Sequence, residues 1–316
     1  MMSNLLYKFA AVIASVSLAG VAAAQEVNPN STALSFLSRN SDPVTLSMGG
    51  ASLATSHSPA YSLFSNPSAM AFADKKLDVA ASFSSWQPDG AASKVIDFGA
   101  AGCFGKFGIA AGISYGKGDE YDVYSESGDK SGTFGPSEMV AGVGLSYRIV
   151  KFLSAGVNLK YASEKLSKDD SYNAFAADVL LTAKLAGFRI AAGARNVGGK
   201  VKASDGTSFS IPSSAAAGVS YGHTFAKKHG ILASVNADYY FEGGAAESFG
   251  VAYTYNNLVS VRGGYCNASD KAPGASFASV GAGVQFLGIR IDAAYLIAGS
   301  DSPMKNTLSV GLGFSF

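Results

Sequence analysis

Leu308-Ser309-Val310-Gly311-Leu312-Gly313-Phe314-Ser315-Phe316 is the stretch that decides the fold. Every second residue in it is leucine, valine or phenylalanine, and glycine and serine fill the positions between them. Side chains alternate between the two faces of a β-strand, so one face of this segment is apolar and the other is small and polar. This pattern is typical of a strand that turns one face to lipid and the other to the lumen of a barrel.

The same period of two extends back along the chain to Leu77. Clusters of Gly, Pro, Asn, Asp and Lys divide it into candidate strands. Most of these have the roughly 9 to 11 residues that a tilted membrane strand needs, and their even number suits a bacterial barrel. The fourteen predicted strands are 77–86, 94–104, 107–116, 137–148, 152–165, 172–185, 187–197, 212–225, 229–242, 246–255, 258–267, 276–287, 288–298 and 306–316.

The connections between these strands support the same number. Alternate connections are tight, as at Gly105-Lys106 and Leu287-Gly288, and all but one of the others are longer. Bacterial barrels have short periplasmic turns and longer outer loops. We therefore expect an all-β fold, a transmembrane antiparallel barrel of about 14 strands over residues 77–316.

The composition favours a membrane protein without helical spans. Charged residues make up 15% of the chain and hydrophobic residues 48%, whereas a soluble protein carries about 25% charge. Polar residues or glycine interrupt every long apolar run after the first two dozen residues, so membrane helices are not expected. A net charge of +1 gives no basic patch for nucleic acid, and the expected surroundings are outer-membrane lipid.

The N-terminal quarter of the chain has a different sequence pattern. Residues 1–24 predict a signal peptide, because Lys8 precedes an apolar run over 9–21 and Ala22-Ala23-Ala24 forms a cleavage pattern. Export to the outer membrane follows from this prediction. Residues 25–76 lack the period of two and are too apolar for disorder, so we expect them to form a hatch or plug in the barrel lumen.

The strand parity places charged side chains of both signs on the inner face of the barrel. Ionisable groups within a membrane need partners, so we interpret these charges as internally paired and not as the lining of a wide ion-selective pore. The predicted polar residues of the lumen are Lys160, Asp178, Arg189, Arg195, Asp238, Arg262, Arg290 and Asp292.

Two segments of the predicted plug carry a family resemblance. Leu46-Ser47-Met48-Gly49-Gly50-Ala51 and Ser62-Leu63-Phe64-Ser65-Asn66-Pro67-Ser68-Ala69 resemble the Gly-Gly turn and the Asn-Pro-Ala hatch motif of FadL-like fourteen-stranded barrels, and in particular of their PorV/PorQ branch in Bacteroidetes. Ser68 stands where that motif has alanine. The segments 83–88 and 195–199 also resemble this branch. The resemblance implies a hatch motif made of Gly49, Gly50, Asn66, Pro67, Ser68 and Ala69.

The resemblance implies two main functions. The PorV/PorQ branch implies a role in type IX protein secretion or surface attachment, with secretion-system subunits or secreted cargo as partners. FadL implies a channel for hydrophobic small molecules, with an apolar pocket near Phe134, Phe209 or Phe277. A structural or adhesive barrel with a permanently closed lumen is a third alternative.

The segment 117–136 is the most distinctive outer connection, because it is both acidic and aromatic. It is either a solvated loop or a surface for partner recognition by Tyr121, Tyr124 and Phe134.

No catalytic constellation is visible. His57, His223 and His229 lack the spacing of metal ligands, and no Gly-x-Ser-x-Gly elbow occurs. We therefore expect a non-enzyme without cofactor or metal. Cys103 and Cys266 fall on distant predicted strands and are expected to be free thiols.

Overall fold

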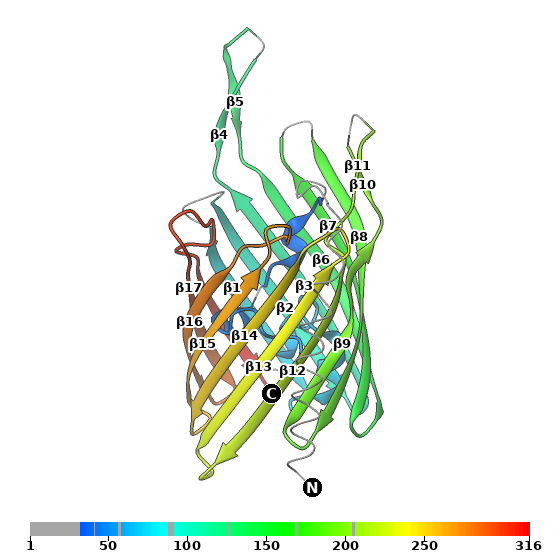
Figure 1. Ribbon diagram of the computed structural model, residues 1–316, viewed down its shortest axis with the longest axis vertical. Helices are drawn as coiled ribbons and strands as arrows, with labels where there is room; N and C mark the ends of the chain where they lie inside the picture. The colour runs from blue at the N-terminus through cyan, green and yellow to red at the C-terminus, as the bar shows by residue number, and fades with distance from the viewer. Residues whose placement is uncertain are drawn as a thin grey trace.

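The computed structural model describes residues 32–40, 42–55, 58–87, 92–125, 127–167, 170–203 and 206–316. Within these residues, fourteen antiparallel strands close into one barrel (Figure 1), which confirms the predicted fold class and strand number. The barrel strands are β1 (Leu77–Trp86), β2 (Ser93–Phe104), β3 (Phe107–Gly118), β6 (Ser137–Val150), β7 (Leu153–Lys165), β8 (Ser171–Leu185), β9 (Phe188–Gly198), β12 (Ser214–Phe225), β13 (His229–Tyr240), β14 (Ala245–Tyr255), β15 (Val259–Ala268), β16 (Phe277–Phe286), β17 (Ile289–Ile297) and β18 (Leu308–Ser315).

The two ends of the barrel differ in their connections. At one end each pair of strands is joined by two or three residues, such as Gly105-Lys106 between β2 and β3. Gly105 has a φ of +65° there, a conformation that glycine adopts readily. Longer connections join the strands at the other end. Because tight turns face the periplasm in bacterial barrels, we refer to the two ends as the periplasmic end and the outer end.

The first and last strands close the ring. β1 pairs with β18 from Asp78 opposite Ser315 to Ser85 opposite Leu308. Beyond this ladder, Leu77 and Phe316 exchange backbone hydrogen bonds of 2.9 and 3.0 Å. The closure leaves no barrel strand with an unpaired edge. A sheet that spans a membrane must have all its edges paired in this way.

The alternation in sequence corresponds to an apolar outer wall. On β18, Leu308 and Leu312 are 47% and 58% exposed, whereas Ser309 between them is 1% exposed and points into the lumen. The same alternation recurs on the other strands, and the exposed positions are mostly Phe, Tyr, Leu, Ile and Val. Such a surface is stable against lipid and not against water. Among the described residues, no helix is long and apolar enough to cross a membrane.

Two small hairpins extend the outer end. β4 (Tyr121–Tyr124) and β5 (Lys130–Phe134) form one, and β10 (Val201–Lys202) and β11 (Ser208–Phe209) form the other. The first hairpin projects far beyond the barrel rim (Figure 1). The sequence predicts one long outer connection over 117–136 and no strands within it. In the structure β4 and β5 pair with each other there, although neither has a buried face that would give a period of two.

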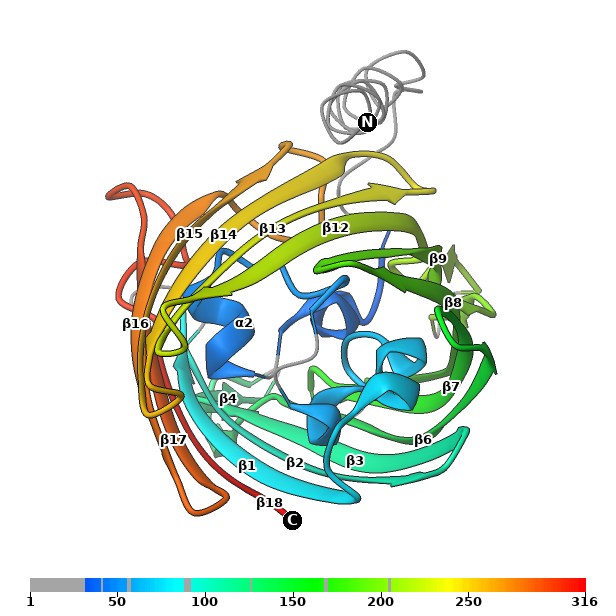
Figure 2. The same ribbon diagram turned by 90° about the horizontal axis from the view of Figure 1, so that it is seen from below.

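The described part of residues 32–76 lies inside the barrel (Figure 2). It contains η2 (Ser35–Ser38), α2 (Pro43–Ser47), η3 (Pro59–Tyr61) and η4 (Pro67–Phe72). The predicted signal peptide, residues 1–24, lies outside the described residues.

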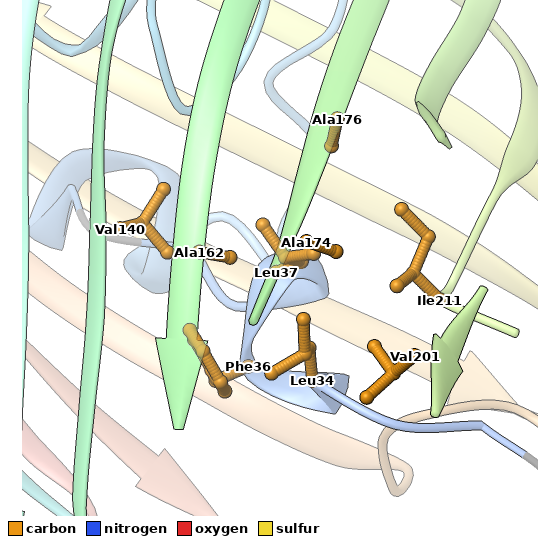
Figure 3. Packing of buried hydrophobic residues seen from close by; sticks show 9 residues of the cluster. All are labelled: Leu34, Phe36, Leu37, Val140, Ala162, Ala174, Ala176, Val201 and Ile211. Atoms are coloured by element: carbon orange, nitrogen blue, oxygen red, sulfur yellow. The ribbon is translucent and has the colours of Figure 1, made fainter. Parts of the chain in front are cut away.

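Buried apolar contacts fix the plug to the wall near the outer end. Leu34, Phe36 and Leu37 of the plug pack together with residues of β6, β7, β8 and the outer loops (Figure 3). Their partners are Val140, Ala162, Ala174, Ala176, Val201 and Ile211. Small side chains on the inner wall leave the volume that the larger plug side chains fill.

Candidate functional site

The Gly-Gly segment of the plug lies in close contact with the barrel wall. α2 begins after Asp42, whose side chain accepts a hydrogen bond of 2.9 Å from the backbone N–H of Val44. The helix ends at Ser47, and Gly49 follows with a φ of +66° in a position that leaves no room for a Cβ beside the backbone of Tyr265. The Gly49 N–H donates to Ser279 Oγ at 2.9 Å, and Asn236 donates to the Gly50 carbonyl at 3.2 Å.

The Asn-Pro segment is a second anchor. Asn66 is extended, and its side chain accepts a 2.9 Å hydrogen bond from the N–H of Ser68 at the start of η4. Its amide donates to the carbonyl of Leu53 at 2.7 Å and to Thr182 Oγ1 of β8 at 2.9 Å. Ser154 of β7 donates to the Ser68 carbonyl at 2.7 Å. The turn is therefore bonded to two strands as well as to itself.

The remaining residues of the predicted motif are buried in the same region. Pro67 occupies the first position of η4, where its missing N–H leaves no helical hydrogen bond unmade. Ala69 is buried, and Gly156 of β7 makes room for the backbone at Ser68. These contacts describe an anchoring corner.

The structure places most of the predicted lumen charges in ion pairs. Lys160 and Asp178 lie on the neighbouring strands β7 and β8, whereas each of the other three pairs spans one intervening strand; the side chains are largely buried. The pairs are Lys160 with Asp178 at 2.8 Å, Arg195 with Asp238 at 3.2 Å, Arg262 with Asp292 at 2.8 Å and Arg290 with Asp78 at 2.6 Å. Arg189 lies near the periplasmic start of β9, within electrostatic reach of Asp74.

Three further charged residues belong to this network but are not among the lumen residues predicted from the sequence. Asp78 is the partner of Arg290. Arg39 of the plug pairs with Glu138 of β6, donates to Ser114 at 3.3 Å, and lies with its guanidinium 5.6 Å from the centre of the Trp86 ring. The parity of β6 signals an inward Glu138, but no local pattern connects it to an arginine 99 residues away.

Two groups of the plug have shifted pKa values. Burial raises the pKa of the Asp42 carboxyl above its ordinary 3.8, and the hydrogen bond from Thr45 opposes that shift only in part. Burial also raises the pKa of the Tyr61 hydroxyl. Both groups are therefore held in an environment that disfavours their charged forms.

A cavity of about 510 Å³ opens above the plug at the outer end. Its walls combine apolar and aromatic side chains with a few charged ones, as ligand pockets of roughly 300 to 1,000 Å³ commonly do. The apolar side chains include Phe36, Leu46, Trp86, Phe277 and Met304. Phe277 lies where the sequence predicts an apolar pocket, whereas Phe134 and Phe209 do not line it.

A second cavity, of about 460 Å³, lies at the periplasmic end. Its lining is more polar and includes Thr254, Arg262, Gln285 and Asp292. Val44 of α2 contributes to this cavity, while Leu46 and Gly50 contribute to the outer one. α2 and the turn after it thus form the partition between the two cavities, and we call the outer one the outer pocket and the other the periplasmic chamber.

The aromatic residues of the long outer connection lie on the projecting hairpin. Tyr121 and Phe134 pack edge to face, with ring centres 5.8 Å apart. The Tyr121 hydroxyl donates to the carbonyl of Leu166 at 3.1 Å, which ties the base of the hairpin to the next loop. Tyr124 is 61% exposed near the tip. Two of the three predicted recognition residues thus hold the hairpin together.

No group of three or more metal-ligating side chains gathers among the described residues. Cys103 and Cys266 are free thiols on β2 and β15, as the strand assignment predicts. His223 and His229 lie on β12 and β13 near the periplasmic turn, and His57 lies outside the described residues.

Neither a protein-family model nor a curated protein matches this chain. Solved structures do match its fold. The Pseudomonas putida toluene transporter TodX superposes with a TM-score of 0.60 at 16% identity, over 86% of this chain and 97% of its own. The Ralstonia pickettii toluene transporter TbuX gives 0.60 at 12% identity, over 87% and 98%. A Pseudomonas aeruginosa FadL homologue gives 0.50 at 13%, over 88% and 97%. The chain therefore has the fold of FadL-type outer-membrane barrels.

Proposed function

We propose that this protein is an outer-membrane channel for hydrophobic small molecules. The observation that carries the proposal is the pair of cavities that lie on opposite sides of α2 and the Gly-Gly turn. A small apolar molecule can be held in the outer pocket against Phe36, Leu46 and Phe277. Displacement of one short segment of the plug then connects it to the periplasmic chamber, without opening the barrel wall.

The solved structures support this proposal as relatives in fold. By their descriptions, TodX and TbuX transport toluene, and another match is a monoaromatic hydrocarbon channel, CymD. A hydrocarbon of this kind is accordingly the first probe to use.

A reversible covalent lock on the partition tests the proposal. A Cβ at Gly50 lies 3.9 Å from the Cβ of Ser248 on β14, within the range of about 3.5 to 4.5 Å that a disulfide needs. The test protein carries Gly50→Cys and Ser248→Cys, with Cys103→Ser and Cys266→Ser to remove the native thiols. Toluene uptake into vesicles is measured before and after reduction, and the bridge is verified by mass spectrometry.

We expect the oxidised protein to lose most of its uptake and the reduced protein to regain it. A matched protein with Gly50→Ala and Ser248→Ala carries the same backbone strain at φ +87° but forms no bridge, so its uptake is expected to be insensitive to oxidation. Uptake by the fully bridged protein at the rate of the reduced one would sink the proposal.

The secretion role implied by the PorV/PorQ resemblance is the second candidate. The projecting hairpin favours it, because β4 and β5 stand clear of the barrel rim (Figure 1) and Tyr124 at the end of β4 is exposed, so that a partner can reach it. The cavities on both sides of α2 favour the channel, and TodX and TbuX are toluene transporters by their descriptions. The channel is therefore our main proposal.

A further inference from the structure

The charge of the outer pocket bears on which ligands it accepts. Six charged side chains line it, two of them basic and four acidic: Arg39, Arg195, Asp119, Glu138, Glu164 and Asp238. No lysine is among the lining residues that the structure describes. The pocket wall therefore has an excess of negative charge.

Both arginines are already engaged with carboxylates. Arg39 pairs with Glu138, and Arg195 pairs with Asp238 at 3.2 Å while also donating to the carbonyl of Phe64 at 3.3 Å. The Nε atoms of both arginines are buried and lack a hydrogen-bond partner, so a ligand in the cavity does not reach them. An anionic ligand would have to displace an existing pair to gain a cationic partner.

The carboxylates of Glu164 and Asp119, in contrast, have no basic partner in the part of the chain that the structure describes. Among the described residues, no lysine or arginine forms an ion pair with Glu164 or Asp119. Glu164 stands directly opposite Glu138 in the ladder between β6 and β7. Like charges opposite one another destabilise a sheet, and Arg39, which pairs with Glu138, is the one arginine that the structure describes beside these two carboxylates. A cation in the pocket would relieve this repulsion.

The aromatic lining suits the same kind of ligand. Trp86 and Phe36 line the pocket together with Tyr121, Tyr240 and Phe277. Aromatic faces attract cations as well as apolar groups. The Arg39 guanidinium already lies over Trp86, which shows that this ring accepts a positive neighbour. Apolar and aromatic surface beside unbalanced carboxylates is suited to a hydrophobic body with a positive charge.

We propose that the outer pocket selects hydrophobic molecules that carry a positive charge and rejects those that carry a negative one. This inference rests on the proposed channel function and deepens it by naming the charge class of the ligand. Attraction acts through the unbalanced carboxylates, and rejection follows from the same carboxylates and from the lack of an unpaired cation in the described lining.

Three molecules with the same decyl chain test the inference. Decyltrimethylammonium, decanol and decyl sulfate are titrated separately onto the protein in vesicles of zwitterionic phosphatidylcholine at pH 7. Trp86 is the single tryptophan of the chain and lines the pocket, so its fluorescence reports occupancy. Each titration is repeated at high salt, which screens exposed charges.

We expect the ammonium compound to bind at least tenfold more tightly than the sulfate, with the difference shrinking at high salt. Glu164→Gln and, independently, Asp119→Asn are each expected to weaken ammonium binding several-fold and to leave decanol unchanged. The control is Asp270→Asn, which removes a carboxylate from the outer end but not from the pocket lining, and it is expected to change nothing. Asp119 is exposed, so its variant tests the inference even where Glu164→Gln fails to fold.

The outcomes separate this inference from the channel proposal. Binding of all three compounds with equal affinity, or a sulfate that binds as tightly as the ammonium, overturns the charge selectivity and leaves the channel standing. Failure of every compound to change the Trp86 signal counts against both.

Discussion

Gly49 allows the Gly-Gly turn of the plug to lie directly against the backbone of β15. At Gly49 the backbone has a positive φ and lies against the backbone of Tyr265, so any side chain meets both strain and overlap. A non-glycine residue in such a conformation costs on the order of 1–3 kcal/mol. The glycine is therefore required by geometry, whatever the plug does in transport.

Gly49→Ala is expected to lower the free energy of unfolding by about 1–3 kcal/mol and to make the plug more sensitive to protease. Urea unfolding in lipid vesicles and limited proteolysis measure the two effects. Gly299→Ala is the control, since a Cβ there meets nothing within 4 Å. Equal stability of the two variants would contradict the close contact described for Gly49.

Asp42 predicts a dependence of plug stability on pH. Its folded-state pKa is raised above 3.8, so the folded protein holds the proton more tightly than the unfolded chain does. The stability from that proton is fully present below pH 3.8 and is lost as the pH rises through the folded-state pKa. Asp42→Asn keeps a capping side chain but cannot ionise.

The variant is accordingly expected to match the parent at acid pH and to gain relative stability as the pH rises. Unfolding free energies measured from pH 3 to pH 8 check this. Asp129→Asn on the exposed hairpin is expected to leave the pH profile unchanged. If the difference in unfolding free energy between the parent and Asp42→Asn does not vary with pH, the pH dependence does not arise from Asp42.

At the scale of elements, buried ion pairs hold plug and wall strands in register. Lys160 on β7 and Asp178 on β8 are both almost fully buried, and Asp178 also accepts hydrogen bonds from Asn158 and from the backbone N–H of Asn196. Asn158 in turn donates to the plug carbonyls of Ser62 and Leu63 at 3.2 and 3.0 Å. Removal of the cation leaves a buried carboxylate without its counter-ion.

Lys160→Met is expected to destabilise the protein by about 3–5 kcal/mol, measured by urea unfolding in vesicles. The double variant Lys160→Met, Asp178→Asn is expected to recover part of that loss, because it removes both charges. The matched control is Lys130→Met, which breaks the exposed pair with Asp122 on the hairpin, where little change is expected. A loss of the same size in both single variants would argue against a special role of burial.

The elements also show how far sequence reasoning reaches. All fourteen barrel strands were predictable to within two residues at each end, because lipid on one side and a lumen on the other impose a period of two along every strand. β4 and β5 were not predictable in this way, since both of their faces meet solvent. Parity placed Lys160 and Asp178 in the lumen, but the pairing of Arg39 with Glu138 depends on how the plug folds, which no period encodes.

For the whole molecule, the projecting hairpin separates the two candidate functions. The two strands of its base are held together, with the N–H of Gly118 2.8 Å from the carbonyl of Pro136. Residues 122–133 can therefore be replaced by a short glycine linker without moving β3 or β6 and without removing Tyr121 from the outer pocket. We expect the shortened protein to fold, and to take up toluene within about twofold of the parent rate because the partition is untouched.

Uptake assays measure the rate of toluene transport by the shortened protein, and co-purification from native membranes identifies the partners that it still binds. Loss of a bound secretion subunit or cargo together with unchanged uptake would assign partner binding to the hairpin. Tyr124→Ser in the full-length hairpin tells whether the exposed ring alone is responsible. An unfolded barrel after the deletion would contradict the independence of hairpin and barrel.

The seam between β1 and β18 has a consequence for assembly. The strand that directly follows the plug pairs with the last strand of the chain, so the final hydrogen-bonded ladder joins residues more than two hundred positions apart. Contacts of such high sequence separation form late, because a long loop must first be closed. A plug that collapses against the curling sheet before this closure is enclosed without threading. The order of synthesis, with the plug first and the closing strand last, therefore matches the order in which a filled barrel is most simply built.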